Sequence, residues 1–484
     1  MELDLLNSPL VQAGLAAVVA LVILLVASRR PKNAPPNVRK GLPIIGNFIE
    51  FAKGPMNFMN ACYAEYGSVF TMGMPGCHLT FLIGPEAGEC FFAAEDDVMS
   101  QTEVYGFVRP VFGPDVVYDA PLNVRRQQMA KMSQGLRKAR LVSYVPKIVR
   151  ETVDFVKEWG SDGQLDILQS LSDLTILTAS RCLHGDDVRE NMFKEVSHLY
   201  HDLDQGITPL SFFLPYIPIP AHMKRDRARK EMVALFSKVI SARREDPEGN
   251  KDNTDLLQVF IDMAYKDGSK NTNDQITGLL IALLFAGQHT SSITSTWTTL
   301  FLAHHPDILR RVVAELDAKW PRGEELTFEH VQSFDLLHNC VKEALRMHPP
   351  LIMLMRKVKQ DVECKSHDGK RYTVPKGDIV VTSPAVSHRL DYVFSEPNRF
   401  DPDRYDAPRE EDKQEAFPFA YLGFGAGNHS CMGERFGLMQ VKTIVATIVR
   451  NFDIEPVGEL PGADYTAMVV GPLGQPQIKY RRKA

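Results

Sequence analysis

The 484-residue sequence contains only seven cysteines, and no two of them form a Cys-x-x-Cys pair. They are an odd and scattered set, at Cys62, Cys77, Cys90, Cys182, Cys340, Cys364 and Cys431. Disulfide frameworks and structural zinc sites usually need paired cysteines at short, regular spacings. The pattern therefore argues against both kinds of site and favours a reducing compartment.

The sequence also lacks an excess of positive charge, an internal repeat and an internal linker. Its formal net charge is −5, with 44% hydrophobic and 24% charged residues. Proteins that bind nucleic acid through its phosphates are usually basic, so nucleic acid is not an expected partner. No flavin-binding or nicotinamide-binding pattern is present. The proportions of hydrophobic and charged residues, together with the lack of a linker, predict one large globular domain with a sizeable core.

One uncharged run lies at the N-terminus, from Leu10 to Ala27, and two arginines, Arg29 and Arg30, follow it. About 18 residues just span a bilayer, and the basic flank favours the cytosolic side. A cleaved signal peptide would need a basic start, which this chain lacks. We expect a membrane anchor over residues 1–30 (transmembrane helix about 10–27), a proline-rich connector over 31–37 and one domain over 38–484.

Apolar periodicity predicts a mainly α-helical chain with a small β-sheet region. The expected helices cover residues 56–66, 125–143, 147–159, 192–203, 225–243, 254–265, 276–302, 307–320, 336–347 and 434–451. The best strand candidates are residues 68–72, 80–83, 355–358 and 379–382.

A glycine-rich loop near the C-terminus reads Phe-Gly-Ala-Gly-Asn-His-Ser-Cys-Met-Gly, from Phe424 to Gly433. Its glycines let the backbone turn tightly against a flat ligand, and the amides of a helix beginning near Glu434 favour a thiolate at Cys431. A lone cysteine is usually a small core residue, but this spacing resembles the haem-binding loop of the cytochromes P-450. The resemblance implies haem b with Cys431 as the iron ligand, and thiolate ligation favours oxygen activation.

Two further features of that family occur upstream in the same order. Glu343 and Arg346 stand three residues apart in a helical stretch and so share a helix face. Alone, such a pair is usually a weak surface ion pair, but in the family it joins a second arginine behind the cysteine loop. Arg399 is the expected partner, although Asn398 replaces the usual acid before it.

The other feature is the apolar helix over residues 276–302, which small residues interrupt. Ala286 and Gly287 would let a planar cofactor and dioxygen approach the backbone, and Thr290 offers a hydroxyl for ordering oxygen or its protons. The alternative is that Gly287 only permits close helix packing. The resemblance implies the cytochrome P-450 fold, with haem buried between this helix and the cysteine loop.

Two stretches resemble one branch of the family, the sterol 14α-demethylases. His289 stands where most of the family has an acid, and the segment from Tyr105 to Pro121 matches the first substrate-contact segment of the branch. The resemblance covers the chain from about Val38 to its end. It implies removal of the 14α-methyl group of a sterol precursor as formate in three monooxygenations, in the endoplasmic reticulum membrane with the catalytic domain cytosolic.

The resemblance also implies which residues bind the cofactor and the sterol. The expected haem contacts are Tyr105, Tyr118, Arg126, Arg356, His429, Phe424 and Gly425. Arg125 could take the place of Arg126, because only the register of the helix distinguishes these two adjacent arginines. The expected sterol contacts are Tyr105, Phe107, Phe112, Phe285, Ala286, Leu351, Met353, Met355, Met468 and Val469, any one of which could instead be plain core. A bulky ring at Phe107 is expected to favour sterols with one methyl group at C4, such as obtusifoliol.

Protons are expected from His289 paired with Asp204, because histidine titrates near neutral pH. The alternative is that Asp204 is an unrelated surface acid. Electrons must come from a membrane-bound NADPH-dependent cytochrome P-450 reductase, since the chain has no nucleotide site of its own. Azole-type compounds are expected as inhibitors. An acidic reductase could be steered to the basic residues Lys131, Arg137, Lys138 and Arg140.

Three other functions remain open at this point. They are a haem-thiolate monooxygenase acting on another lipid, a haem-thiolate isomerase or dehydratase that needs no reductase, and a haem- or sterol-binding protein without catalysis. A lack of NADPH-driven oxygen consumption would distinguish the last.

Overall fold

The structure, a computed structural model, describes residues 30–38, 46–74, 76–251, 253 and 255–483. The α-helices are α2 (Phe48–Lys53), α3 (Pro55–Tyr66), α4 (Pro85–Ala93), α5 (Thr102–Tyr105), α6 (Arg109–Phe112), α7 (Leu122–Gly135), α8 (Lys138–Lys157), α9 (Ile167–Ala179), α10 (Asp186–Asn191), α11 (Phe193–Gln205), α12 (Pro220–Glu245), α13 (Leu256–Asp262), α14 (Asn273–His304), α15 (Pro306–Lys319), α16 (Phe328–Ser333), α17 (Asp335–Met347), α18 (Pro384–Ser387) and α19 (Glu434–Asn451). Shorter helical turns are η1 (Gly106–Val108), η2 (Val117–Asp119), η3 (Ser180–His184), η4 (Pro209–Phe212), η5 (Pro402–Tyr405) and η6 (Gly427–His429).

The strands form three small sheets. They are β1 (Val69–Met74), β2 (Cys77–Leu82), β3 (Met99–Ser100), β4 (Asp162–Asp166), β5 (Leu354–Val358), β6 (Val362–Lys365), β7 (Arg371–Val374), β8 (Ile379–Thr382), β9 (Phe452–Pro456) and β10 (Gln477–Arg482). The largest sheet has the order β1-β2-β8-β5-β3, in which only β2 and β8 pair in parallel. The expected architecture, mainly α-helical with a small sheet region, is confirmed.

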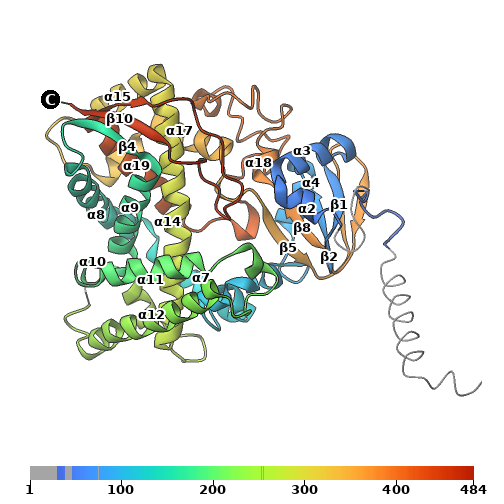
Figure 1. Cartoon of the computed structure of the whole chain (residues 1–484), viewed down its shortest axis with the longest axis horizontal. Coiled ribbons are helices and arrows are strands. Elements are labelled where there is room, and N and C mark those ends of the chain that lie inside the picture. Colours follow the sequence, from blue (N-terminus) through green and yellow to red (C-terminus); the bar gives the residue numbers. More distant parts are fainter. Residues whose placement is uncertain (1–29, 39–45, 75, 252, 254, 484) are drawn as a thin grey trace, which may run out of the picture.

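The helix α14 crosses the middle of the molecule (Figure 1), with α8, α9 and α19 on one side and the largest sheet on the other. It begins at a capping box, in which Thr272 Oγ1 accepts from the Gln275 amide and the Gln275 side chain accepts from the Thr272 amide. Its side chains are buried on nearly all faces, including that of Trp297. A helix that is apolar all round belongs in a protein core.

Most long helices lie within a few residues of their predicted places, but the region after Pro121 differs. One predicted helix over 125–143 is in fact two, because the chain is extended at Arg137, and α8 then continues through Pro146. Proline removes a hydrogen bond to the carbonyl four residues earlier. That residue, Val142, is 40% exposed, so the proline lies on the solvent side of α8. The helices α4 and α9 were not predicted.

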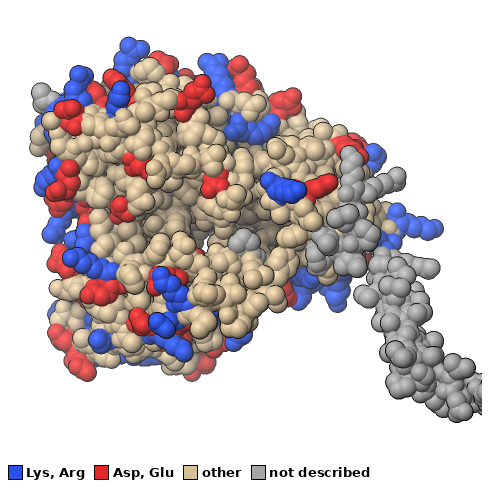
Figure 2. Space-filling model, in the orientation of Figure 1, with Lys and Arg blue, Asp and Glu red and all other residues tan. Residues whose placement is uncertain are grey.

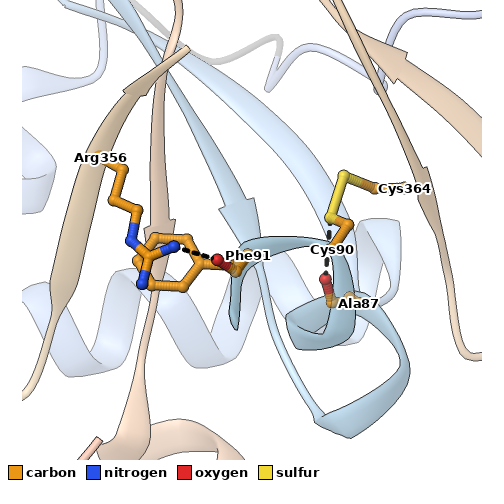
Figure 3. Close-up of a disulfide and its surroundings, with 5 residues drawn as sticks. All are labelled: Ala87, Cys90, Phe91, Arg356 and Cys364. Atoms are coloured by element: carbon orange, nitrogen blue, oxygen red, sulfur yellow. Dashed lines mark hydrogen bonds between the residues drawn. A yellow bond between two sulfur atoms is a disulfide. The ribbon is translucent and has the colours of Figure 1, made fainter. Parts of the chain in front are cut away.

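The structure contradicts the expectation that the cysteines form no disulfide. Cys90 of α4 and Cys364 of β6 are joined, with 5.5 Å between their Cα atoms and 274 residues between them in the sequence. Figure 3 shows the bond beside Phe91, whose carbonyl accepts a hydrogen bond from Arg356 of β5. Sequence spacing could not reveal this pair, because only the fold brings α4 against β6.

The predicted anchor at residues 10–27 lies outside the described residues. The proline-rich segment after it lies against the domain: Arg30 pairs with Asp378 at 2.7 Å, and the Thr71 amide donates to the Pro36 carbonyl at 2.8 Å. Within the described residues, only α14 is long and apolar enough to cross a membrane, and most of it is buried inside the protein.

Candidate active site

The cysteine loop is shaped by its glycines. Gly425 and Gly427 have φ angles of 68° and 64°, in the left-handed region that favours glycine. A Cβ on Gly427 would lie 2.2 Å from the carbonyl oxygen of Phe92 in α4. The loop closes where the Cys431 amide donates to the Phe424 carbonyl at 2.8 Å. The prediction of a tight turn is therefore confirmed, and the close backbone approach at Gly427 is to α4; the approach to a flat ligand stays a prediction.

The helix α19 begins at Glu434, as the sequence predicted. Burial raises the pKa of the Cys431 thiol, whereas hydrogen bonds from the backbone of Gly433 and Glu434 lower it. The net pKa is raised, so burial outweighs the helix amides in the protein alone. A metal beside the sulfur deprotonates a coordinating thiol outright, and the amides then support the thiolate.

Glu343 is the centre of a buried ion cluster. Its carboxylate accepts hydrogen bonds from Arg346 at 2.8 and 2.9 Å, from Arg404 at 2.9 Å and from the Tyr405 hydroxyl at 2.9 Å. The side chains of Glu343, Arg346 and Arg404 have no exposed surface. The pair of Glu343 and Arg346 is thus part of the core and not a surface ion pair.

The prediction that Arg399 supplies the second guanidinium is wrong. Its side chain is 65% exposed and pairs with Glu396. Arg404 takes the buried position, because the Asp401 amide donates to Glu343 at 3.0 Å and the chain then enters the short helix η5. The register of such an irregular segment cannot be derived from periodicity.

His388 connects this cluster to the cysteine loop, and it was not predicted. Burial lowers the pKa of His388 to about 3, so its neutral ring has one donor and one acceptor. Nδ1 donates to the Arg346 carbonyl at 3.0 Å, and Nε2 accepts from the Leu422 amide at 2.7 Å. Leu422 leads into the loop, so two hydrogen bonds join the Glu343 cluster to it.

Two arginines and a histidine meet around Asp96, just after α4. One oxygen of Asp96 lies 3.2 Å from both Arg125 Nη2 and His429 Nε2, and the other lies 3.6 Å from Arg126 Nη2. Arg125 is buried, whereas the Arg126 side chain is 64% exposed. Burial therefore favours Arg125, the other choice of register, as the inward residue, and which of the two arginines contacts the haem stays a prediction. Asp96 was not predicted, because a lone acid in a loop carries no signal.

Tyr105 and Tyr118 are half-buried and Arg356 is buried, and the side chains of all three carry donors near this cluster. The two tyrosine rings stack with centroids 4.9 Å apart, and burial raises the pKa of both hydroxyls, so they stay protonated. Burial lowers the pKa of Arg356 to about 10, which leaves it charged at neutral pH. In the described part of the chain, Arg356 Nε has no hydrogen-bond partner. A buried guanidinium nitrogen without a partner fits a site for an anionic group.

The predicted gap in α14 is present. Ala286 is exposed, although its helix is otherwise core. A Cβ on Gly287 would meet no neighbouring atom closer than 3.8 Å, so close helix packing does not explain this glycine. The Thr290 hydroxyl donates to the Ala286 carbonyl at 2.6 Å. A Cβ on Gly437 of α19 would lie within 4.0 Å of Ser291 and Phe424, so α14 faces the cysteine loop here.

The predicted contact between His289 and Asp204 is also present. His289 Nε2 of α14 lies 3.0 Å from Asp204 Oδ1 of α11, and both side chains are partly exposed. The alternative that Asp204 is an unrelated surface acid is therefore wrong.

The predicted sterol contacts come together from four segments. Phe112 and Phe285 meet edge to face with centroids 5.9 Å apart, and Tyr105 and Phe107 lie 6.4 Å apart. The Val470 amide donates to the Pro350 carbonyl at 2.8 Å, which brings the C-terminal segment to the strand region. Several of these apolar residues are exposed (Leu351, Met468) or half-buried (Met353, Met355, Val469), so they are not plain core.

This donor set fits a haem with a cysteine ligand. The thiol of Cys431 belongs to the loop that α14 faces, and phenol and guanidinium groups that suit two propionates come from α5, η2, α7 and β5. The residues that would hold the propionates are Tyr105, Tyr118, Arg125, Arg356 and His429.

Comparison with known proteins supports this fit. The family model of the cytochromes P-450 matches residues 35–479. Sterol 14-demethylase of Arabidopsis thaliana is 44% identical over 100% of this chain and 99% of that protein. Obtusifoliol 14-alpha demethylase of Sorghum bicolor is 44% identical over 99% of each, and lanosterol 14-alpha demethylase of Homo sapiens is 37% identical over 93% of this chain and 87% of that protein. Retinoic acid-bound cyanobacterial CYP120A1 has the same fold, with a TM-score of 0.82 at 23% identity over 94% of this chain and 100% of that chain. The chain belongs to the cytochrome P-450 family.

Proposed function

We propose that this protein is a sterol 14α-demethylase, a haem-thiolate monooxygenase that removes the 14α-methyl group of a sterol precursor. The observation that carries the proposal is the 3.0 Å contact between Asp204 and His289 beside the open part of α14. It joins the histidine that distinguishes this branch of the family to an acid 85 residues away in the sequence.

The sterol methyl group is oxidised to an alcohol and then to an aldehyde, and the aldehyde carbon leaves as formate while an adjacent ring carbon loses a hydrogen, which forms the ring double bond. Each of the three steps would consume one dioxygen molecule and two electrons from the reductase. Thiolate-ligated haem b supplies oxygen activation when it is bound. The phenol and guanidinium groups of the chain would hold the propionates, and its exposed apolar residues would orient the sterol toward Ala286. Asp204 and His289 hold a proton at the solvent side of α14, within the turn that carries Thr290.

Replacing Asp204 by alanine is expected to lower kcat by about tenfold or more, because general acid–base groups typically contribute at least this much. The bound haem should keep its absorption spectrum. Steady-state turnover with a reductase and NADPH measures the effect. Asp202, two residues earlier on α11 and paired with Lys224 at 2.6 Å, is the matched control; equal slowing by Asp202→Ala would argue against a relay through Asp204.

We propose a preference for sterols with one methyl group at C4. Phe107 is 6% exposed, and its ring stacks on Phe212 with centroids 4.0 Å apart. The ring is therefore held from one side and cannot move aside readily for a second methyl group. Relatives at 44% identity from Sorghum bicolor and Triticum aestivum are named for obtusifoliol.

In a mixture of obtusifoliol, eburicol and lanosterol, we expect obtusifoliol to be demethylated first, with products identified by mass spectrometry. Phe107→Leu should raise the relative rate of the two C4-dimethyl sterols by several-fold, since one large ring is replaced by a smaller side chain. Faster turnover of a C4-dimethyl sterol by the unaltered protein would overturn the preference. Conversion of none of the three would overturn the proposed function.

The electron donor is an NADPH-dependent cytochrome P-450 reductase. The basic residues predicted to meet it do not lie on one helix, because Lys131 belongs to α7, Arg137 to the break after it, and Lys138 and Arg140 to α8. They still follow one another closely along the surface at this break, where an acidic partner can be attracted. Azole-type compounds are proposed as inhibitors.

We place the protein at the endoplasmic reticulum membrane with the catalytic domain on the cytosolic side. The structure adds an exposed apolar patch, formed by Ile49, Phe212, Phe213, Leu214, Tyr216 and Met223. Phe213 meets Phe48 edge to face at 5.8 Å, which joins the α11–α12 connection to α2. Figure 2 shows few charged side chains between α11 and the largest sheet. Such a patch suits a bilayer surface, and sedimentation with membranes tests the assignment.

A further inference from the structure

Two hydrogen bonds join α11 to α14 in the described part of the chain. One is the contact of Asp204 with His289, and the other runs from the Tyr200 hydroxyl to Gln288 Oε1 at 2.9 Å. Tyr200 and Asp204 are four residues apart on α11, and Gln288 and His289 are adjacent on α14. The two bonds therefore lie one helical turn apart on α11 and reach neighbouring residues on α14.

The second bond is buried, unlike the first. Tyr200 is 3% exposed and Gln288 is 7% exposed, whereas Asp204 and His289 are partly open to solvent. Burial and the nearby charge of Asp204 raise the pKa of Tyr200 well above its usual value, so the hydroxyl keeps its proton and is the donor. A buried bond of this kind holds its two groups in a narrow range of positions.

The ring of Tyr200 also lies between the sterol contacts and the proton pair. Its centroid is 4.6 Å from that of Phe285 and 6.0 Å from that of His289. Phe285 in turn meets Phe112. Tyr200 therefore packs against Phe285 of the predicted sterol contacts and against His289 of the proton pair. A shift of its ring would move His289 relative to Asp204.

We propose that Tyr200 and Gln288 are positioning residues for the proton pair: their buried hydrogen bond keeps α11 at the distance from α14 at which Asp204 meets His289. This inference rests on the proposed role of that pair. It assigns a function to two polar residues that touch neither the cysteine loop nor the cluster around Asp96.

Tyr200→Phe removes only the hydroxyl and keeps the ring contacts with Phe285 and His289. Loss of one hydrogen bond of ordinary strength predicts that kcat falls about fivefold. The KM for the sterol and the spectral change on sterol binding should stay as they were, since the ring still fills its place. More of the NADPH should be consumed in reducing oxygen to hydrogen peroxide instead of oxidising sterol. Tyr144→Phe, which removes another buried hydroxyl that donates to the Gly135 carbonyl at 3.2 Å, is the control and should leave kcat unchanged.

A double-mutant cycle with Asp204→Ala separates this inference from the function on which it rests. If Tyr200 acts through the pair, adding Tyr200→Phe to Asp204→Ala slows kcat no further. Multiplying effects would overturn the inference, and so would a full rate in Tyr200→Phe alone, while the role of Asp204 would stand in both cases. If Asp204→Ala turns over at the full rate, the proton pair and this inference fall together.

Tyr200→Phe leaves Gln288 Oε1 buried without its partner, which by itself could loosen the fold. The combined variant Tyr200→Phe and Gln288→Met replaces both polar groups by apolar ones of similar size. We expect it to fold stably and to stay slow, because the bond between the helices is still missing. Recovery of the full rate would show that only the unpaired atom mattered and would overturn the inference.

Discussion

Cys431→Ala is expected to abolish sterol turnover completely and to remove the red-shifted spectrum that thiolate-ligated ferrous haem shows with carbon monoxide. The loop offers one thiol at the wall that faces α14, and its backbone is fixed by the Phe424 carbonyl and the glycines. No other side chain of the loop can replace a thiolate as an iron ligand of the same kind. The carbon monoxide difference spectrum of the purified variant measures the effect.

Cys77→Ala is the matched control. Cys77 begins β2 in the largest sheet, forms no disulfide and is partly exposed. Its loss should leave both the spectrum and the turnover intact, because Cys77 belongs to neither the loop nor α14. A normal spectrum in Cys431→Ala would show that the iron has a different ligand, and the assignment of the loop would then be lost.

Arg404→Met is expected to destabilise the folded protein by about 3–5 kcal/mol, the usual cost of removing one partner from a buried ion cluster. Glu343 would keep its charge in a site with no exposed surface and lose the Arg404 hydrogen bond at 2.9 Å. Its contact with Arg346 would remain. The midpoint of unfolding in urea, followed by the loss of helical signal, measures the change.

Arg399→Met is the matched comparison, because the sequence alone predicted Arg399, and not Arg404, as the buried partner of Glu343. Arg399 pairs with Glu396 on the surface, at 65% exposure, and exposed pairs of this kind contribute about 0–1 kcal/mol. The urea midpoint of this variant should stay close to that of the unaltered protein. A larger loss for Arg399→Met than for Arg404→Met would mean that Arg399, and not Arg404, belongs to the buried cluster.

The two pairs of variants, at Cys431 and Cys77 and at Arg404 and Arg399, show where periodicity and spacing in the sequence are sufficient to predict contacts and where they are not. The cysteine loop, the pair of Glu343 and Arg346, and the gap at Ala286 are local: their residues stand within one turn or one loop, so their spacing already determines which groups can meet. The predicted helices of the second half of the chain lie near their true bounds for the same reason. The break near Arg137 was misplaced because a proline such as Pro146 usually marks a helix end, whereas α8 runs through it.

The contacts that cross the fold required the structure. Asp96 gathers Arg125 and His429 from segments that are far apart in the sequence, and the choice between Arg125 and Arg126 depends on which of them the fold buries. The Cys90–Cys364 disulfide and the bond between Tyr200 and Gln288 likewise join distant segments.

The sequence by itself determined the family and predicted the candidate ligand cysteine, because both depend on residue identity within short motifs, and it proposed Asp204 as the partner of His289 only through the resemblance to one branch of that family. The tertiary structure alone decided which arginines are buried, which cysteines are joined and which tyrosine holds α11 to α14. Burial and long-range pairing depend on how whole helices and strands pack, and many sequences with the same local periodicity are compatible with different packings.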